Sequence, residues 1–156
     1  MNHRAIPASG RLAGIDYGTV RIGISISDPS RIVASPYENY SRRSAEADAD
    51  YFRRFADGEN VVGFIVGLPV HGSGEESQKS REARRFGKWL QETTQRPVAF
   101  HDERFTSAHA RQLLAGAELT RKKSKSRLDM IAAQIILASF LESSDSGVES
   151  PGPLED

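Results

Sequence analysis

The sequence predicts an α/β domain built on a mixed five-stranded sheet, in which three antiparallel strands precede parallel β-α units and helices cover both faces. Two observations support this prediction. Short apolar runs separated by turn residues crowd into residues 11–36, as in an antiparallel meander. Beyond them, strand-like runs alternate with helix-like segments, which is the pattern of parallel β-α units.

The three opening strands are expected at residues 12–16, 21–27 and 31–36. The first is a short apolar run that Tyr17 and Gly18 close, and in the second isoleucine alternates with small or polar residues. Asp28-Pro29-Ser30 is a turn signal, so the third strand is expected directly after it. A polar helix with an aromatic stripe is then expected at residues 44–56.

The second half of the chain alternates between strands and helices. Residues 61–66 form a continuous apolar run, as in strands buried on both faces. A helix at 75–93, a short strand at 98–101, a helix at 107–115 and a last helix at 127–142 are expected to follow. This order of elements matches that of an RNase H-like domain.

The length of 156 residues fits one domain with one site. Residues 1–10 and 143–156 have no periodic apolar positions, so both are expected to be flexible ends of an ordered body at residues 11–142. The chain has no cysteine, which excludes disulfides and thiolate metal sites. No secretory signal or membrane span is apparent, so a cytoplasmic protein is expected.

The charge is unevenly distributed although the net charge is zero. The acidic segment 143–156 holds four of the 21 acids and no lysine or arginine, so the rest of the chain has 21 basic and 17 acidic residues, a charge of +4. Basic clusters can contact phosphates, but they can equally be solvated helix faces. One cluster consists of Arg121, Lys122, Lys123, Lys125 and Arg127, and another of Lys79, Arg81, Arg84, Arg85 and Lys88.

Asp16 is the first candidate site residue, because it ends the first expected strand and Gly18 lets the chain turn sharply away. Taken alone, an Asx-type turn is the more common role for such an aspartate. A phosphate-binding turn like that of actin and sugar kinases, built from Asp16, Gly18, Thr19 and Gly23, is a weaker alternative.

Asp102 and Glu103 form the second candidate, directly after the strand at 98–101. Successive side chains of a strand point to opposite faces, so both acids could reach one metal only if the strand has already ended. Helix capping and a salt bridge to Arg104 are the structural alternative.

Asp129 is the third candidate, an acid within the otherwise apolar last helix. Its spacing from Ser126 is that of a capping box, which would tie the carboxylate to its own helix. Alternatively, Ala132 and Ala133 on the same face let the helix approach the sheet closely and direct Asp129 at the strand ends.

Three separated acids in this order suit one chemistry. Carboxylate oxygens are hard ligands for Mg²⁺ or Mn²⁺, and two ions about 4 Å apart can activate water and stabilise the leaving oxygen of a phosphodiester. No HxxxH metal motif or G-x-S-x-G elbow offers an alternative chemistry.

Four linked motifs resemble those of the YqgF (RuvX-like) family. They span residues 11–142 in the family's order and are the stretches 12–28, 66–69 (Val-Gly-Leu-Pro), 102–106 (Asp-Glu-Arg-Phe-Thr) and 125–133 (Lys-Ser-Arg-Leu-Asp-Met-Ile-Ala-Ala). The resemblance implies an RNase H-like fold and a pre-16S rRNA nuclease, described in older terms as a Holliday junction resolvase.

By motif position, the resemblance implies Asp16, Glu103 and Asp129 as catalytic and metal-binding acids, with Asp102 as a reserve ligand. It also places Arg21 and Arg104 as phosphate contacts or supports for the acids. Two positions depart from the family: Ser73-Gly74 stands where an Asp-Gly pair is usual, and Phe105 replaces an aliphatic residue.

The expected partner is therefore structured RNA, with branched DNA as the nearest alternative and no membrane. Arg21, Arg104 and the basic cluster at 121–127 are expected to hold the nucleic acid. A non-catalytic RNA- or transcription-complex-binding module is the alternative of another class. The sequence leaves monomer and homodimer open.

If the strand order is RNase H-like, the strand at 61–66 lies between those carrying Asp16 and Glu103, so Glu103 must lean inward to reach Asp16.

Overall fold

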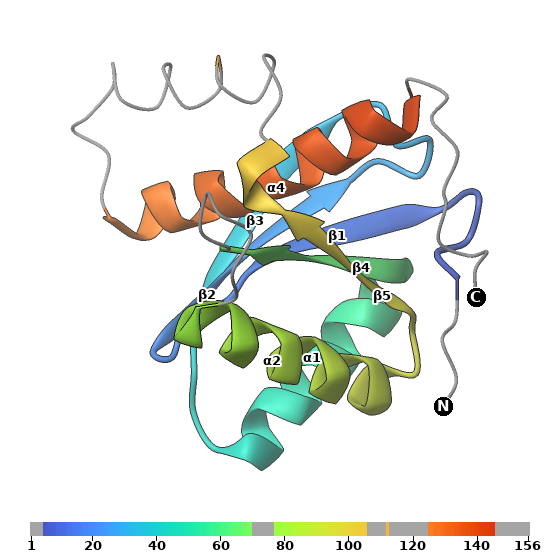
Figure 1. Cartoon of the computed structure of the whole chain (residues 1–156). Coiled ribbons are helices and arrows are strands. Elements are labelled where there is room, and N and C mark those ends of the chain that lie inside the picture. The colour runs from blue at the N-terminus through green and yellow to red at the C-terminus, as the bar shows by residue number, and fades with distance from the viewer. Residues whose placement is uncertain (1–4, 70–76, 106–111, 113–124, 146–156) are drawn as a thin grey trace.

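The computed structural model describes residues 5–69, 77–105, 112 and 125–145. Five strands form one sheet, and helices lie on either side of it (Figure 1). In chain order, the elements are β1 (Arg11–Asp16), β2 (Arg21–Ser27), β3 (Ala34–Ser41), α1 (Ala45–Gly58), β4 (Val61–Leu68), α2 (Gln78–Thr94), β5 (Val98–Asp102), the short 3₁₀ helix η1 (Glu103–Phe105) and α4 (Lys125–Asp145).

The sheet has the strand order β3-β2-β1-β4-β5, which confirms the predicted mixed sheet. The β1–β2 and β2–β3 pairs are antiparallel, whereas β1–β4 and β4–β5 are parallel. The parallel strands β1, β4 and β5 therefore end at the same edge of the sheet. As expected, β4 separates the strand that ends in Asp16 from the strand that precedes Glu103.

The third strand was predicted wrongly at 31–36, because it begins at Ala34 and continues to Ser41. The turn after β2 is longer than its sequence indicates. The Asp28 carboxylate accepts hydrogen bonds from the backbone N–H groups of Ile32 (2.8 Å) and Val33 (2.7 Å), and Arg31 has a φ of 61°. These contacts keep residues 31–33 out of the sheet. The helix expected at 107–115 falls outside the described residues, apart from position 112.

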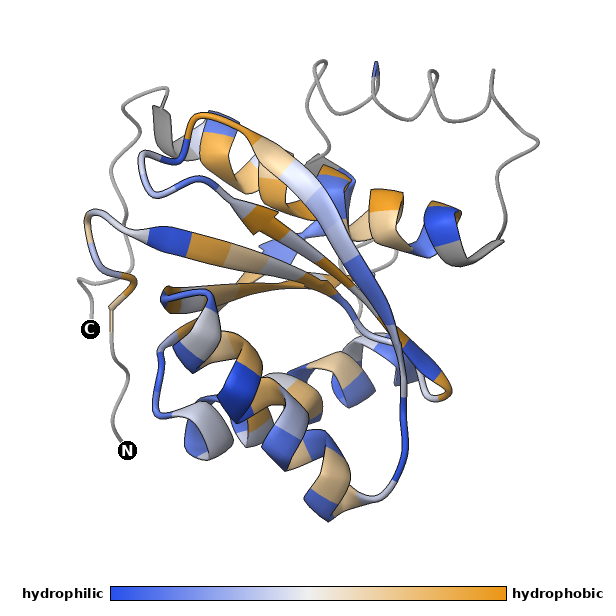
Figure 2. Cartoon of the chain, turned by 180° about the vertical axis from the view of Figure 1, so that it is seen from behind, coloured by the Kyte–Doolittle hydropathy of each residue, from blue (hydrophilic) through white to orange (hydrophobic). Residues whose placement is uncertain are grey.

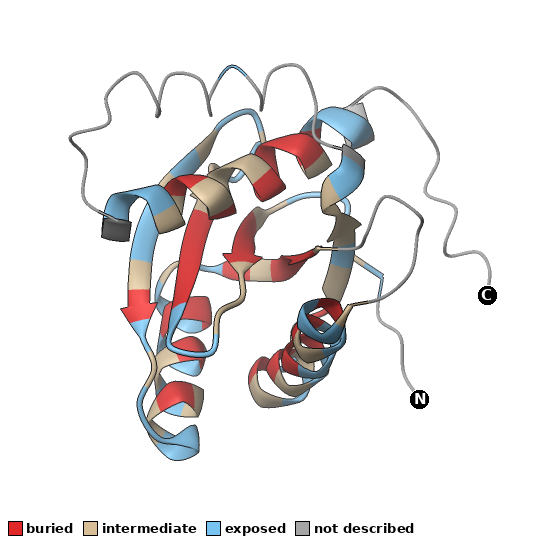
Figure 3. Ribbon diagram, turned by 60° about the vertical axis from the view of Figure 1, so that its left-hand side comes forward, coloured by how far each residue is buried: buried red, intermediate tan, exposed pale blue. Residues whose placement is uncertain are grey.

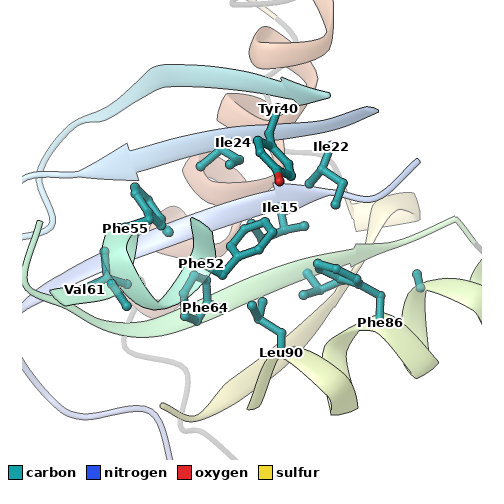
Figure 4. Packing of buried hydrophobic residues seen from close by; sticks show 14 of the residues in the cluster. Ile15, Ile22, Ile24, Tyr40, Phe52, Phe55, Val61, Phe64, Phe86 and Leu90 are labelled. Atoms are coloured by element: carbon teal, nitrogen blue, oxygen red, sulfur yellow. The ribbon is translucent and has the colours of Figure 1, made fainter. Parts of the chain in front are cut away.

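Helices α1 and α2 cover one face of the sheet with an aromatic core. Phe52 and Phe55 of α1 and Phe86 and Leu90 of α2 pack against buried residues of the strands, including Phe64 (Figure 4). Hydrophobic and hydrophilic residues alternate along both helices (Figure 2), as expected for helices with one face on a sheet. Ser44 caps α1 by accepting from the Ala47 N–H.

Helix α4 covers the opposite face and contacts β1, β2, β3 and β4. Its buried residues Ile136, Leu137 and Leu141 pack against Leu12 and Ile65 of the central strands, which are buried on both faces (Figure 3). No helix in the described ranges is long and apolar enough to cross a bilayer.

The helix comes very close to the sheet at Ala133, as predicted. The Ser25 hydroxyl donates to the Ala133 carbonyl at 2.8 Å, and a Cβ at Gly14 would lie 2.8 Å from the same oxygen. This close approach brings the first turns of α4 over the ends of β1 and β2.

Candidate active site

Asp16 is the last residue of β1, and its partner in the antiparallel register is Gly23 of β2. Its side chain lines a cavity of about 440 Å³, together with the turn that follows, which includes Gly18 and Thr19. Gly18 has no alternative here, because a Cβ would collide with the Arg21 carbonyl. The strand end and the tight turn thus present the carboxyl group to the cavity.

Glu103 reaches the same cavity from η1, directly after β5. It leans inward across the end of β4, as the strand order requires. A Cβ on Gly67 of β4 would lie 2.6 Å from Glu103 Oε2, so the missing side chain at position 67 provides the path. Gly67 therefore allows an acid beside β5 to approach an acid on β1, across the strand between them.

Asp129, the fifth residue of α4, lines the cavity from above the sheet. Its Oδ2 accepts from Asn39 Nδ2 on β3 at 3.1 Å and lies 3.9 Å from Arg21 Nε on β2. Gly23 permits this placement, because a Cβ there would collide with the Asp129 carbonyl. The carboxylate is bound to the sheet, as the second of the two sequence interpretations expected.

The three candidate acids thus come from three separate elements and line one cavity, here called the acid cavity. They do not form a closed cluster: among the described residues, no three histidine or acidic side chains are close enough to hold one ion. Its lining consists of Asp16, Tyr17, Gly18, Thr19, Val20, Arg21, Gly23, Gly67, Pro69, Lys79, Glu82, Ala83, Glu103 and Asp129.

Two acids of the acid cavity have raised pKa values. Burial, followed by the charge of Asp129, raises the pKa of Asp16 to about 6. Burial, followed by the charge of Asp16, raises the pKa of Glu103 to about 7. Asp16 is thus the acid that interacts with both of the others. Two carboxyls with raised pKa values in one cavity are typical of functional sites.

Asp102 does not share this cavity. Its carboxylate is bound by Arg104, with Nη2–Oδ2 at 2.6 Å and Nε–Oδ1 at 3.1 Å, and it also accepts from the Arg104 N–H. The Arg104 hydrogen bond is the main reason that the pKa of Asp102 is lowered. Because β5 ends at Asp102, the two neighbouring acids diverge: Asp102 forms the predicted salt bridge, and Glu103 turns into the acid cavity.

Two residues of this site were not predicted from the sequence. Asn39 holds the Asp129 carboxylate, and its own Oδ1 is buried without a hydrogen-bond partner among the described residues. Lys79, at the start of α2, lines the acid cavity and lowers the pKa values of Asp16 and Glu103. The sequence indicated Lys79 only as one member of a basic cluster.

The predicted phosphate contacts are distributed unevenly. Arg21 lines the acid cavity, whereas Arg104 is outside that lining and bound to Asp102. Arg127 is exposed on α4, and Lys125 is the first residue of that helix. Arg121, Lys122 and Lys123 lie outside the described residues, as does the Ser73-Gly74 loop.

Comparison with known proteins identifies the family of this chain. The sequence model described as "RuvX: Holliday junction resolvase" matches residues 10–143. The chain therefore belongs to the RuvX family. A relative from Rhodopirellula baltica is 51% identical over 87% of this chain and 79% of its own length, and one from Koribacter versatilis is 35% identical over 93% of this chain and 94% of its own. Both carry the name "Putative pre-16S rRNA nuclease".

Solved structures confirm the RNase H-like fold of this RuvX family member. Thermus thermophilus RuvC in complex with a Holliday junction substrate aligns with a TM-score of 0.63, at 12% identity, over 90% of this chain and 98% of RuvC. The yeast mitochondrial Holliday junction resolvase aligns with a TM-score of 0.53, over 88% of this chain and 80% of its own. The family and the names of these relatives identify the chain as a nuclease.

Proposed function

We propose that this chain is a magnesium- or manganese-dependent nuclease that hydrolyses a phosphodiester bond in structured RNA, and that its substrate is the 5′ end of pre-16S rRNA. The observation that carries the mechanism is the convergence of Asp16, Glu103 and Asp129 on one cavity from three separate elements. Such processing would take place where ribosomes are assembled, in the cytoplasm.

The residues of the acid cavity suit a divalent metal. Carboxylate oxygens are the ligands that Mg²⁺ prefers. Burial, followed by repulsion between the acids, raises the pKa values of Asp16 and Glu103, and a bound cation would favour their charged forms. When bound, the metal would supply an activated water and stabilise charge on the leaving oxygen. Binding would also draw the three acids closer together, because it removes their mutual repulsion.

Each residue has a role that follows from its position. Asp16 interacts with both other acids, so it is placed to be the shared ligand, with Glu103 and Asp129 on either side. Asn39 orients Asp129. Arg21 and Lys79 bring positive charge to the same cavity and can bind the phosphates that flank the cleaved bond.

The choice of RNA rests on the names of relatives such as those from Rhodopirellula baltica and Koribacter versatilis, which refer to pre-16S rRNA. The family description favours a second candidate with the same chemistry, the cleavage of a Holliday junction. Both substrates present a phosphodiester in a structured nucleic acid, so the acid cavity suits either.

Cleavage of the two substrates by the full-length protein tests the proposal. A pre-16S rRNA fragment and a four-way DNA junction are incubated with Mg²⁺ or Mn²⁺, or with a chelator. We expect metal-dependent cleavage of the RNA, and Asp16→Asn should slow it roughly 1,000-fold or more. Asp50→Asn is the matched control, because Asp50 is an exposed partner of Arg54 on α1.

The outcomes separate the alternatives. Cleavage of the junction alone would select the second candidate. RNA binding that needs no metal and survives Asp129→Asn, without cleavage of either substrate, would make the chain a non-catalytic binding module. Cleavage that Asp16→Asn leaves unchanged would refute the acid assignment.

A further inference from the structure

A second cavity of about 450 Å³ adjoins the acid cavity. Tyr17, Thr19 and Glu82 line both cavities, so the two are neighbours on either side of the turn that follows Asp16. The volume lies within the range of sites for small ligands, about 300–1,000 Å³. We call it the aromatic cavity, and its wall includes Tyr17, Arg42, Arg85, Phe86 and Trp89.

The wall of the aromatic cavity is a run of neighbouring rings. The ring centroids of Tyr17 and Phe86 are 4.9 Å apart, and those of Phe86 and Trp89 are 5.4 Å apart. Phe86 is buried, whereas Tyr17 and Trp89 are partly exposed. The aromatic core thus extends from the buried Phe86 to two rings, Tyr17 and Trp89, that are partly accessible from the surface.

Arg42 fixes the position of the Tyr17 ring at the edge of this group of rings. Arg42 donates to the Tyr17 hydroxyl at 2.8 Å, its guanidinium lies 5.3 Å from the Tyr17 ring centroid, and it pairs with Asp48 at 3.3 Å. Arg42 and Arg85 oppose Asp48 and Glu82 in the lining, so the formal charges balance. A neutral, flat ligand suits such a cavity better than an isolated phosphate does.

We propose that the aromatic cavity binds one unpaired nucleobase of the substrate strand, beside the nucleotide whose phosphate lies in the acid cavity. This inference rests on the proposed function, since it needs a nucleic acid in the acid cavity. Aromatic rings and guanidinium planes are the surfaces on which proteins stack unpaired bases, and every base offers the same flat face. Glu82 adds an acceptor for the amino or ring N–H groups of the base edge.

The arrangement has a consequence for substrate choice. Tyr17 directly follows Asp16 in the chain, so a strand that leaves the acid cavity along this turn meets the aromatic cavity first. A base that is paired in a helix cannot enter it. The nucleotide beside the cleaved bond must therefore be unpaired or pulled out of its stack.

Trp89 permits a direct test, because it is the sole tryptophan of the chain. The probe is an RNA stem-loop with a single-stranded extension, whose duplex fixes the binding register, added to the full-length protein in a chelating buffer that prevents cleavage. We expect saturable quenching of tryptophan emission. Removing one base at a time from the extension should weaken binding about 5- to 100-fold at one position.

Variants of Trp89 provide the protein side of the test, measured by anisotropy of a labelled RNA. Trp89→Leu should bind the intact and the abasic RNA equally, whereas Trp89→Phe should restore the difference because it keeps a ring. If Trp89→Leu does not fold, the abasic series on the unaltered protein still decides the matter.

This inference and the proposed function can fail separately. If the RNA is cleaved normally but no single base affects binding and Trp89 emission does not change, the base site is refuted and the nuclease stands. If neither substrate is cleaved but one base still controls binding, the aromatic cavity is a base site on a protein whose proposed reaction is wrong.

Discussion

The pKa values of the carboxyl groups are shifted in opposite directions at two places in this molecule, the start of α1 and the acid cavity. Asp48, at the start of α1, is 1% exposed and fully provided with donors: the Tyr40 hydroxyl at 2.7 Å, the Arg43 N–H at 2.9 Å and the Arg42 guanidinium at 3.3 Å. These contacts outweigh its burial, and its pKa is lowered. Asp16 and Glu103 are only partly buried, yet their pKa values are raised.

The difference lies in what each acid faces. Asp48 faces donors and a cation, whereas Asp16 is partly desolvated beside Asp129 and Glu103, and the charge of Lys79 offsets this in part. A carboxylate that serves stability is neutralised by its own chain, because an unpaired buried charge is costly. Acids that repel one another in a partly buried cavity are instead suited to bind a cation from solution. This contrast supports the acid cavity as the metal site.

The largest effect on stability is expected at the neutralised acid. Asp48→Ala should lower the free energy of unfolding by about 3 kcal/mol, because it leaves Arg42 and the Tyr40 hydroxyl without their buried acceptor. Urea denaturation measures this change. Asp50→Ala, at an exposed carboxylate two residues along α1, is the control and should change it by less than about 1 kcal/mol. Equal losses would show that the buried network contributes nothing.

The next largest effect is expected at Asn39, which orients the Asp129 carboxylate through a hydrogen bond. Asn39→Ala should lower cleavage about 10- to 100-fold and raise the magnesium concentration needed for half-maximal rate, because Asp129 loses its orienting donor. Ser35→Ala, at an exposed position earlier on β3, should change neither quantity. If excess magnesium does not restore any of the lost rate, Asn39 does not act through Asp129.

The candidate acids could be predicted from the sequence, because each has a local signal: Asp16 ends a strand, Glu103 follows one, and Asp129 interrupts an apolar helix face. Asn39 could not, because its contact with Asp129 spans 90 residues and depends on the register between β2 and β3. The start of β3 was missed for a related reason, since the Asp28 carboxylate binds two backbone N–H groups that looked available to the sheet.

The choice between Asp102 and Glu103 also needed the structure. Both acids follow the same strand, and the sequence offered no means of ranking them as ligands beyond the family motif. What separates them is the 2.6 Å contact between Asp102 and Arg104 and the missing side chain at Gly67. Both depend on how the strand ends and on its neighbour in the sheet, which are properties of the folded chain.

A pH-dependent stability difference should distinguish these neighbouring acids. The pKa of Glu103 rises from 4.5 to about 7 on folding, so the folded state binds the proton more tightly, and stability is lost as pH rises from 4.5 to 7. In chelator at pH 8, Glu103→Gln should therefore stabilise the protein by roughly 1–2 kcal/mol, allowing for solvent screening. Thermal unfolding at several pH values measures this gain, which should vanish below about pH 4.5.

Asp102→Asn is the matched control, and its effect on stability at pH 8 should have the opposite sign. The lowered pKa of Asp102 contributes stability that is present above the ordinary value of 3.8 and lost as pH falls, so its amide variant should be destabilised at pH 8. Stabilisation by both amides, or by neither, would contradict the contrast between the two acids.

The smallest effect is expected at Lys79, the cation that partly offsets the acid cavity. Its charge lowers the pKa values of Asp16 and Glu103 and should repel a divalent ion in the same space. At pH 8.5, where the acids are ionised with or without this charge, Lys79→Gln should lower the half-saturating magnesium concentration roughly threefold. Lys88→Gln, on the same helix but outside the cavity lining, should leave it unchanged. A higher magnesium requirement in Lys79→Gln would show that this lysine aids metal binding, which would place the ions away from it.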